Sequence, residues 1–530
     1  MSGLKRLWQG VIGLEVHAQI SSASKLFSAS PTAFNMPVNT QVSLFDAAIP
    51  GTLPVLNQRC VELALRTALA LNCRINDVSA FDRKHYFYAD MPAGYQITQH
   101  FRPLANHGRL EFYWQPDDND PTSIAESVAD IVQLQLEQDS GRSLHDSERQ
   151  LSLIDLNRAG VALMELITGP TLTCGAEAAG FVRELVDLLR CLGACTGSLA
   201  EGALRVDANV SCRPAPPAAG DSGLGVRTEI KNINSLAALA RAIDFEVARQ
   251  AAVLDAGEEV INETRALADD ATGRSVSMRD KERVQDYRFM PEPNLPPLFP
   301  SDLLPAASVD LPPPDQLPPG LRRRLRQELG FSYQHLASSV VAARPLADWR
   351  YLDAAVTAAK LSRPVTSPHL GRWFVHCFLG NCFRLLGESA AAEDSGISVE
   401  SFGAFLSLAV DCAMISEEVG ERLLERMFAQ PSMDPLAEVQ RLNWFLTRNP
   451  TEVASRFSQF FHRQDIASKN LDQLVKYGKF KLRGNSKKAS VIEERFLALF
   501  MEAAEYTVDR TVAAKVVADI LQSGVAPPPS

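Results

Sequence analysis

The chain has 530 residues, of which 46% are hydrophobic and 22% charged, the balance of an ordinary globular protein. Its length predicts several domains, and its 53 Lys and Arg against 63 Asp and Glu give a formal net charge of −10. This charge argues against a dedicated non-specific nucleic-acid binder, but it does not exclude a local basic patch. The nine cysteines include no CxxC pair, which argues against a structural zinc site. No apolar run reaches the roughly 18 residues of a membrane span.

The first 300 residues mix strand-like runs with helical spacing. Strand signals bounded by Gly, Pro and Asn lie at 11–20, 83–91 and 204–212. Apolar residues at helical spacing occupy 61–71 and 176–192. This mixture predicts an α+β domain over residues 1–298 with a mostly antiparallel sheet.

Prolines dominate the next segment, which includes PEPNLPPLFP and LPPPDQLPP. Since proline continues neither helices nor inner strands, we expect an extended linker at 299–319. From Leu321 the pattern becomes helical. It predicts an all-α domain over 320–432 and a small helical tail domain over 433–530.

Several familiar catalytic motifs are absent from the sequence. It has neither GxxxxGK[ST] nor GxGxxG, so a bound nucleotide would be held through metal and scattered side chains. It also lacks GxSxG and a Cys/His nucleophile signature, so we expect no nucleophilic hydrolase chemistry from this chain.

Glu15, His17 and Gln19 alternate with apolar residues in VIGLEVHAQI. On a strand, period-two spacing points all three to one face. A carboxylate beside an imidazole suits a divalent metal or a proton-transfer pair. The alternative is a solvated strand face with a hydrogen-bonded histidine.

Two further segments carry candidate groups. In FDRKHYFYADMPAGYQITQ, Arg83 and Lys84 suit phosphate oxygens, although a half-buried hairpin with a charged rim fits the composition as well. Glu165 lies alone in the apolar run VALMEL, where burying an unpaired acid is costly. That placement predicts a metal or cation partner, with an arginine salt bridge as the alternative.

Polar residues alternate again in EGALRVDANVS, where Arg205, Asp207 and Asn209 share one strand face, and Glu229 and Lys231 follow in RTEIKNINS. Each string alone fits a solvated strand face or loop. Together they indicate a polar cavity that handles phosphate and metal.

In order, these strings resemble the amidotransferase B-subunit family over residues 11 to about 298. The strings that carry the resemblance are GLEVHAQISSASKLFS, PGTLPVLN, FDRKHYFYADMPAGYQITQ, LEQDSGRSLH, LIDLNRAG, EGALRVDANVS, RTEIKNINS and RDKERVQDYRFMPEPNLPP. Among them, LEVHAQISS, YADMPAGYQ and LEQDSG look most like the mitochondrial branch.

The resemblance implies a cradle-shaped kinase domain, followed by the helical and tail domains. It implies that ATP and Mg²⁺ activate the side-chain carboxylate of Glu-tRNA(Gln), and that ammonia from the glutaminase A-subunit then gives Gln-tRNA(Gln). The C-subunit is the other implied partner. The implied location is the mitochondrial matrix, with a bacterial cytoplasm as the alternative.

The resemblance also assigns roles to residues. The implied metal ligands are Glu15, His17, Gln138 and Glu165, where Gln138 stands in place of a second consecutive acid found in many members. Lys84, Asp207 and Asn209 are carried to the catalytic pocket, and nucleotide binding falls to Arg83, Lys84 and Lys231.

A basic strip in the tail is the candidate tRNA contact. Its cations are Lys476, Lys479, Lys481, Arg483, Lys487 and Lys488. Aromatic residues lie among them, which suits a phosphate backbone with a stacked base, although a solvated loop is the alternative. Two other functions remain open: an enzyme that activates a free small acid, and a non-catalytic protein for tRNA binding or assembly.

Overall fold

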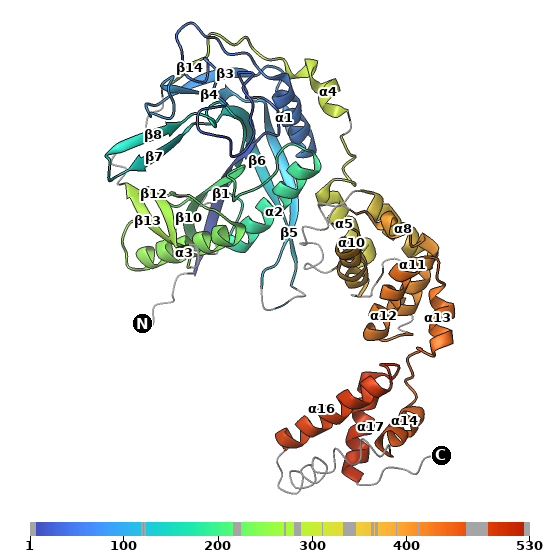
Figure 1. The fold of residues 1–530 in the computed structure, drawn as a ribbon. Helices are drawn as coiled ribbons and strands as arrows, with labels where there is room; N and C mark the ends of the chain where they lie inside the picture. The colour runs from blue at the N-terminus through green and yellow to red at the C-terminus, as the bar shows by residue number, and fades with distance from the viewer. Residues whose placement is uncertain are drawn as a thin grey trace. The chain divides into compact units, whose positions relative to one another are not determined.

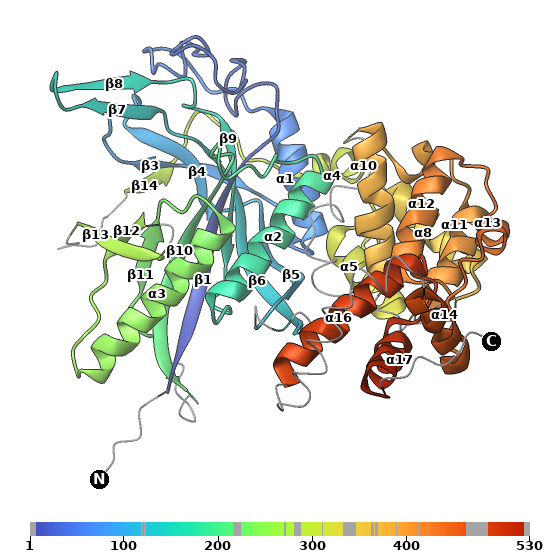
Figure 2. The ribbon, with the colours of Figure 1, turned by 60° about the horizontal axis from the view of Figure 1, so that its bottom comes forward.

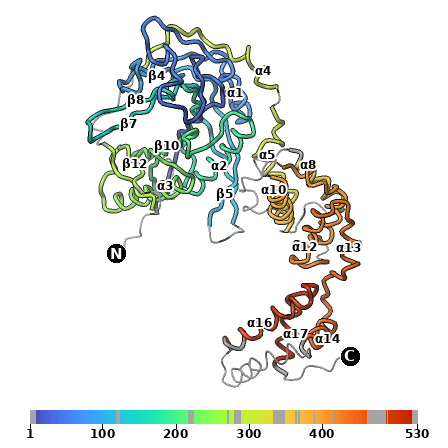
Figure 3. Tube along the Cα trace, viewed as in Figure 1, coloured from blue at the N-terminus to red at the C-terminus, as the bar shows by residue number. Residues whose placement is uncertain are grey.

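The computed structural model describes residues 7–117, 120, 123–215, 224–269, 272–279, 288–309, 311–331, 346–361, 365, 369–387, 390–411, 414–462 and 486–523. The described residues up to Arg324 form one compact unit, and those from Leu325 onward form a second. Figure 3 traces both units in residue order.

A nine-stranded sheet is the centre of the first unit (Figure 1). Between neighbouring described strands the pairing is antiparallel, except that β11 and β12 are parallel. In sheet order the strands are β13 (Arg274–Arg279), β12 (Thr264–Asp269), β11 (Thr228–Lys231), β10 (Leu204–Ala215), β1 (Leu7–Gln19), β9 (Ala162–Thr168), β6 (Ala125–Gln138), β5 (Ala105–Trp114) and β2 (Arg74–Ile75). The expectation of a mostly antiparallel sheet is confirmed.

Two smaller sheets complete the β structure of the described residues. One has the order β14 (Phe289–Pro291), β3 (Ala80–His85) and β4 (Tyr95–Arg102), and the other is the hairpin of β7 (Arg142–Asp146) and β8 (Leu151–Asp155). The strand expected over 83–91 ends at His85. Beyond it the chain turns, with Met91 N–H donating to Tyr88 O and Gly94 N–H to Met91 O.

Three helices, α1 (Gln58–Ala70), α2 (Gly175–Cys191) and α3 (Leu236–Asp255), cover one face of the large sheet (Figure 2). The alternate strand residues Leu14, Val16 and Ala18 are buried against this layer. Side chains of Asn57 and Ser235 cap the first free N–H groups of α1 and α3. Because strand side chains alternate, the polar residues of β1 lie on the opposite face of the sheet.

The sequence suggested an extended proline-rich segment, but the structure shows that it is partly helical. It contains a 3₁₀ turn at Pro300–Asp302, helix α4 (Leu304–Ser308) and the start of α5 (Pro318–Leu329). Ala307 and Leu317 are buried in the core of the first unit. Proline is compatible with the first turn of a helix, which its missing N–H does not weaken. The segment therefore packs as part of the first unit.

The second unit is helical in its described residues, as expected. After α5 its elements are α8 (Leu346–Ala358), α9 (His369–Gly371), a π-helical stretch (Arg372–Leu379), α10 (Gly380–Leu386), a 3₁₀ turn (Ala392–Ser395), α11 (Val399–Leu406), a second π-helical stretch (Ser407–Asp411), α12 (Glu417–Ala429), α13 (Pro435–Leu442), α14 (Pro450–His462), α16 (Ser486–Ala503) and α17 (Arg510–Ser523).

Helices α14, α16 and α17 have a hydrophobic core of their own, which includes Phe457, Phe496 and Phe500. The domain boundaries expected from the sequence stay predictions. Among the described helices, none combines the length and the hydropathy of a membrane-crossing segment.

Candidate functional site

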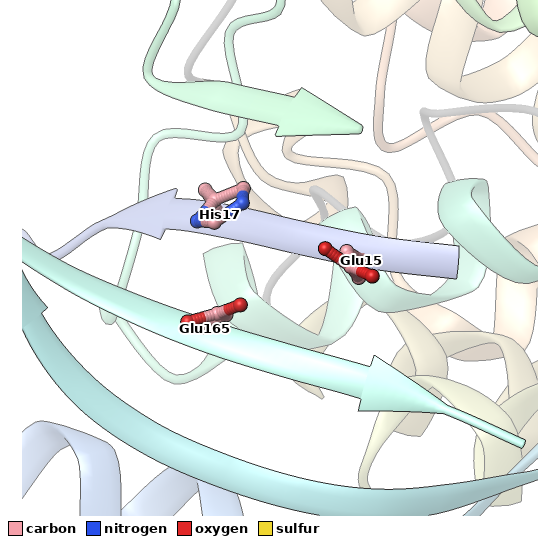
Figure 4. Close-up of side chains that lie close together, drawn as sticks. All are labelled: Glu15, His17 and Glu165. Atoms are coloured by element: carbon pink, nitrogen blue, oxygen red, sulfur yellow. The ribbon is translucent and has the colours of Figure 1, made fainter. Parts of the chain in front are cut away.

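Three side chains converge on the polar face of the large sheet (Figure 4). Glu15 and His17 come from β1, and Glu165 lies directly opposite His17 on the neighbouring strand β9. Each residue offers one possible ligand atom, a carboxylate oxygen or an imidazole nitrogen, and these three atoms all lie within 4.8 Å of one another. The alternation in β1 and the register with β9 bring together the three residues that the sequence singled out.

Glu165 is a buried acid held in an unfavourable environment for its charge. Burial, followed by repulsion from Glu137, raises its pKa to about 7, against the opposing charges of His17 and Lys84. Gln135 Nε2 donates to Glu165 Oε2 at 2.5 Å. A cation between these carboxylates would relieve the repulsion.

Glu137 is a site residue that the sequence assignment missed. It lies on β6 two residues after Gln135, and therefore on the same face as Gln135 and Glu165. Its Oε1 lies 3.6 Å from His17 Nδ1, and burial raises its pKa. The alternation of Gln135 and Glu137 along one strand was the signal that could have found it.

The side chain of Gln138, which the resemblance assigns as a metal ligand, is engaged with β4, and that assignment stays a prediction. As the next residue along β6, it points to the other face. Its Oε1 accepts the backbone N–H of Ile97 at 2.9 Å, and its carbonyl accepts from Gln96 Nε2 at 2.7 Å. Gln138 thus fixes β4 against β6.

Strand β10 lines the other side of β1. Asn209 Nδ2 donates to Glu15 Oε1 at 2.9 Å and so orients that carboxylate. Asp207 lies opposite Glu15 in the register. Lys231 Nζ lies 2.7 Å from Asp207 Oδ2 and 3.0 Å from Glu229 Oε1. Burial opposes the charge of Lys231, but the two carboxylates outweigh it and raise its pKa.

Lys84 and Arg83 point in opposite directions from β3. The charge of Lys84 lowers the pKa of both Glu137 and Glu165. Arg83 instead binds the buried carboxylate of Glu292 with Nε–Oε2 at 2.6 Å and stacks over Tyr95. Arg83 is therefore engaged in holding β3 to the chain near β14, which does not support its assignment to nucleotide binding.

The donor set fits a divalent cation. Among the residues that the structure describes, three buried polar atoms around the cluster have no hydrogen-bond partner: His17 Nδ1, Glu137 Oε2 and Asn209 Oδ1. Leaving such atoms unpaired costs about 1–3 kcal/mol each. Protein carboxylates are also the groups that commonly hold Mg²⁺ beside substrate phosphates.

The basic strip of the tail falls largely outside the described residues. Lys476, Lys479, Lys481 and Arg483 lie outside them, whereas Lys487 is exposed at the start of α16 and Lys488 is the next residue of that helix.

Acids, amides and a lysine gathered on the polar face of a sheet are groups expected in the active site of an enzyme. Residues 10–304 match the family described as GatB/GatE catalytic domain, and the chain belongs to this family of amidotransferase enzymes.

Relatives extend the similarity beyond this domain. The mitochondrial glutamyl-tRNA(Gln) amidotransferase B-subunit of Danio rerio is 47% identical over 438 residues, which cover 80% of this chain and 75% of that protein. The protein of the same name from Homo sapiens is 44% identical, with 81% and 76% covered. The aspartyl/glutamyl-tRNA(Asn/Gln) amidotransferase B-subunit of Wolbachia pipientis wMel is 40% identical, with 91% and 94% covered.

Proposed function

We propose that this chain catalyses the ATP-dependent amidation of glutamate esterified to tRNA(Gln). The observation that carries the proposal is the convergence of Glu15, His17 and Glu165 on the polar face of a GatB/GatE domain. The names of the relatives supply the substrate.

The chemistry proceeds in two steps. A carboxylate oxygen of the glutamyl side chain attacks the γ-phosphorus of ATP, and ADP leaves, which gives an acyl phosphate. The lone pair of ammonia then attacks the acyl carbon, phosphate departs with the electrons of the C–O bond, and loss of a proton leaves the amide. Phosphoryl transfer mainly needs positioning and charge neutralisation, which acids holding a metal and nearby cations can supply.

The residues divide this work between them. Glu15, His17 and Glu165 would hold Mg²⁺, with Glu137 beside them and Asn209 orienting Glu15. Mg²⁺ neutralises phosphate charge when it is bound. Lys84 contacts a phosphate oxygen. Lys231 holds Asp207 in place through their ion pair.

The proposal extends to partners and architecture. Ammonia comes from a separate glutaminase, the A-subunit, while the C-subunit completes the enzyme, and the assembly works in the mitochondrial matrix. The chain is arranged as a cradle, a helical domain and a tRNA-binding tail. The mitochondrial names of the Danio rerio and human relatives and the separate core of α14, α16 and α17 support these points.

The test is Glu165→Gln in the assembled enzyme. We expect loss of ATP-dependent activation of Glu-tRNA(Gln), measured as ADP formation and as Gln-tRNA(Gln) made with free ammonium. Assembly and tRNA binding should persist, and titration with Mn²⁺ should show weakened metal binding. Normal turnover in this variant would contradict the proposal.

A substrate comparison separates this function from the activation of a free acid. ADP formation by the wild-type enzyme should require Glu-tRNA(Gln) and should not respond to free glutamate. Glutamine hydrolysis by the isolated chain would contradict the assignment of ammonia production to another protein.

A further inference from the structure

A polar cavity of about 420 Å³ lies in the first unit, at the end of the strand that carries the candidate site. One of its walls is the end of β1, where Gln19 occupies the strand face that also carries Glu15 and His17. Gln19 is the second residue after His17, so it lies roughly 6–7 Å further along the strand. The cavity therefore begins about one amino-acid length from His17.

The lining of this cavity combines three kinds of side chain. Amide and hydroxyl groups such as those of Gln19 and Asn35 offer hydrogen bonds, and Arg142 and Arg158 add cations. Phe34 also lines the cavity and is 61% exposed. Hydrogen-bonding groups, a stacking surface and a guanidinium are the features with which proteins bind nucleotides of single-stranded RNA.

Asn157 holds two walls of the cavity together. Its Oδ1 accepts from the Gln41 backbone N–H at 2.9 Å, and its Nδ2 donates to Pro37 O at 2.7 Å. The side chain of Gln41 in turn exchanges two hydrogen bonds with the backbone of Ala33. A cavity whose walls are tied in this way loses less conformational entropy when a ligand binds.

The charge of Arg158 is only partly balanced by its neighbours. Arg158 Nε lies 3.6 Å from Asp139 Oδ2, and an amino group of Arg205 lies 2.8 Å from the same oxygen. Burial, against the attraction of Asp139, lowers the pKa of Arg158, and the charges of Arg205 and Arg142 lower it further. An anion bound beside Arg158 would offset this repulsion.

Two acids in the lining limit how much negative charge the cavity can accept. They are Asp155, whose Oδ1 accepts from the backbone N–H groups of Asn39 and Asn157, and Glu201. With Arg142 and Arg158 against these acids, the cavity suits a ligand with a single negative charge. A nucleoside with one phosphodiester fits this balance better than a triphosphate, which carries several charges.

We propose that this cavity binds the terminal nucleotide of the aminoacyl-tRNA, with its phosphodiester at Arg142 and Arg158. The inference rests on the proposed function, which brings the glutamyl carboxylate to Glu15, His17 and Glu165. The glutamyl group is esterified to the terminal ribose, so that ribose must lie one glutamyl length from these residues. Gln19 stands at about this spacing from His17. Guanidinium groups form short, charge-assisted hydrogen bonds with phosphate oxygens.

In this arrangement Arg142 and Arg158 are positioning residues, and Arg142 offers the cleaner test. Arg142 is exposed, whereas Arg158 also donates to the backbone oxygens of Ser140 and Gly141 and so supports the fold. The matched control is Arg149, which is 78% exposed, lies in the turn of the same β7–β8 hairpin and is outside the residues that line the cavity.

The experiment compares Arg142→Glu with Arg149→Glu in the assembled full-length enzyme, with free ammonium as nitrogen donor and ADP formation as the readout. Arg142→Glu should raise the KM for Glu-tRNA(Gln) by about tenfold or more, because a charge-assisted contact becomes a repulsive one. The KM for ATP, kcat and the thermal unfolding temperature should equal those of Arg149→Glu.

A substrate with a neutral linkage locates the contact. In this Glu-tRNA(Gln) an uncharged methylphosphonate replaces the last phosphodiester of the chain. The wild-type enzyme should have a higher KM for it than for the natural substrate, because the ligand of Arg142 and Arg158 has lost its charge. Arg142→Glu should bind the neutral substrate at least as well as the natural one.

Equal effects of Arg142→Glu and Arg149→Glu on the KM for Glu-tRNA(Gln) would overturn the inference, since only net charge would then matter. So would a raised KM for ATP alone, or a wild-type enzyme that does not distinguish the two substrates. If Arg142→Glu lowers the unfolding temperature, Arg142→Gln replaces it under the same expectations. A wild-type enzyme that forms no ADP in response to Glu-tRNA(Gln) would refute the proposed function as well, whereas the other outcomes refute this inference alone.

Discussion

His17 and Glu165 face each other across β1 and β9, although 148 positions of the chain separate them (165 − 17). The pairing is a matter of strand register. A slip of one residue would move Glu165 to the helix-covered face, where its neighbours Met164 and Leu166 are now buried. The arrangement of the candidate site thus depends on the same apolar packing that stabilises the sheet.

Glu137 and Gln138 are adjacent residues with opposite orientations, so they make a matched pair of variants. Glu137→Gln should lower the affinity for the divalent ion in the activation step by about 10–100-fold, as loss of a group that supports a metal site commonly does. The reason is that its carboxylate lies beside His17. Titration of ADP formation with Mg²⁺ measures this effect.

Gln138→Leu should leave that Mg²⁺ titration unchanged and lower stability instead. It removes the acceptor of the Ile97 N–H, at a cost of about 1–3 kcal/mol. Equal effects of the two variants on metal dependence would contradict the assignment of Glu137 to the polar face.

Glu184 should make the folded protein less stable as pH rises. Two acids, Glu184 and Asp187, share the single guanidinium of Arg322 in a buried contact. Burial, with repulsion from Asp187, raises the pKa of Glu184 from 4.5 to about 7 despite Arg322. Between these values the folded state keeps a proton that the unfolded chain has lost, so stability falls with rising pH by up to about 3 kcal/mol.

Urea unfolding from about pH 5 to about pH 8 measures this slope. Glu184→Gln should reduce the slope relative to the wild type and raise stability at the alkaline end. An unchanged slope in the variant would show that Glu184 titrates at its ordinary pKa. Arg322→Met should destabilise the fold at all these pH values, because both acids would lose their counter-ion.

Lys25 and Asp46 should stabilise the fold only when both charges are present. Lys25→Met leaves the carboxylate of Asp46 buried without its cation, which costs about 3–5 kcal/mol. Adding Asp46→Asn should recover part of that loss, since an amide oxygen still accepts the Ser43 N–H. Urea unfolding measures the free energy of unfolding of each variant. If the double variant lost as much of it as the two single variants together, a direct coupling would be contradicted.

The basic strip of the tail should contribute to tRNA binding. Reversing the charges of Lys479, Lys481 and Lys487 should lower tRNA affinity and flatten its salt dependence by roughly 0.7–0.9 log unit per lost phosphate contact. Filter binding at several salt concentrations gives the slope. An unchanged affinity and an unchanged salt slope would show that the strip is exposed to solvent and does not contact tRNA.

The sequence by itself determined which residues share a strand face. Alternation in VIGLEVHAQI places Glu15 and His17 together and opposite Val16 and Ala18, because side chains in a strand repeat every two residues. The apolar periods of α1 and α2 likewise follow from local spacing. These features follow from local sequence alone and do not depend on which segments pack together.

Only the tertiary structure decided which strands meet and in what register. It showed that Glu137 rather than Gln138 joins His17, since the parity of β6 relative to β9 fixes which of two neighbours faces the cluster. It also showed that Arg83 binds Glu292, far along the chain. Such pairings arise from the packing of segments that local sequence does not relate, because cross-strand register is set by burial of whole faces.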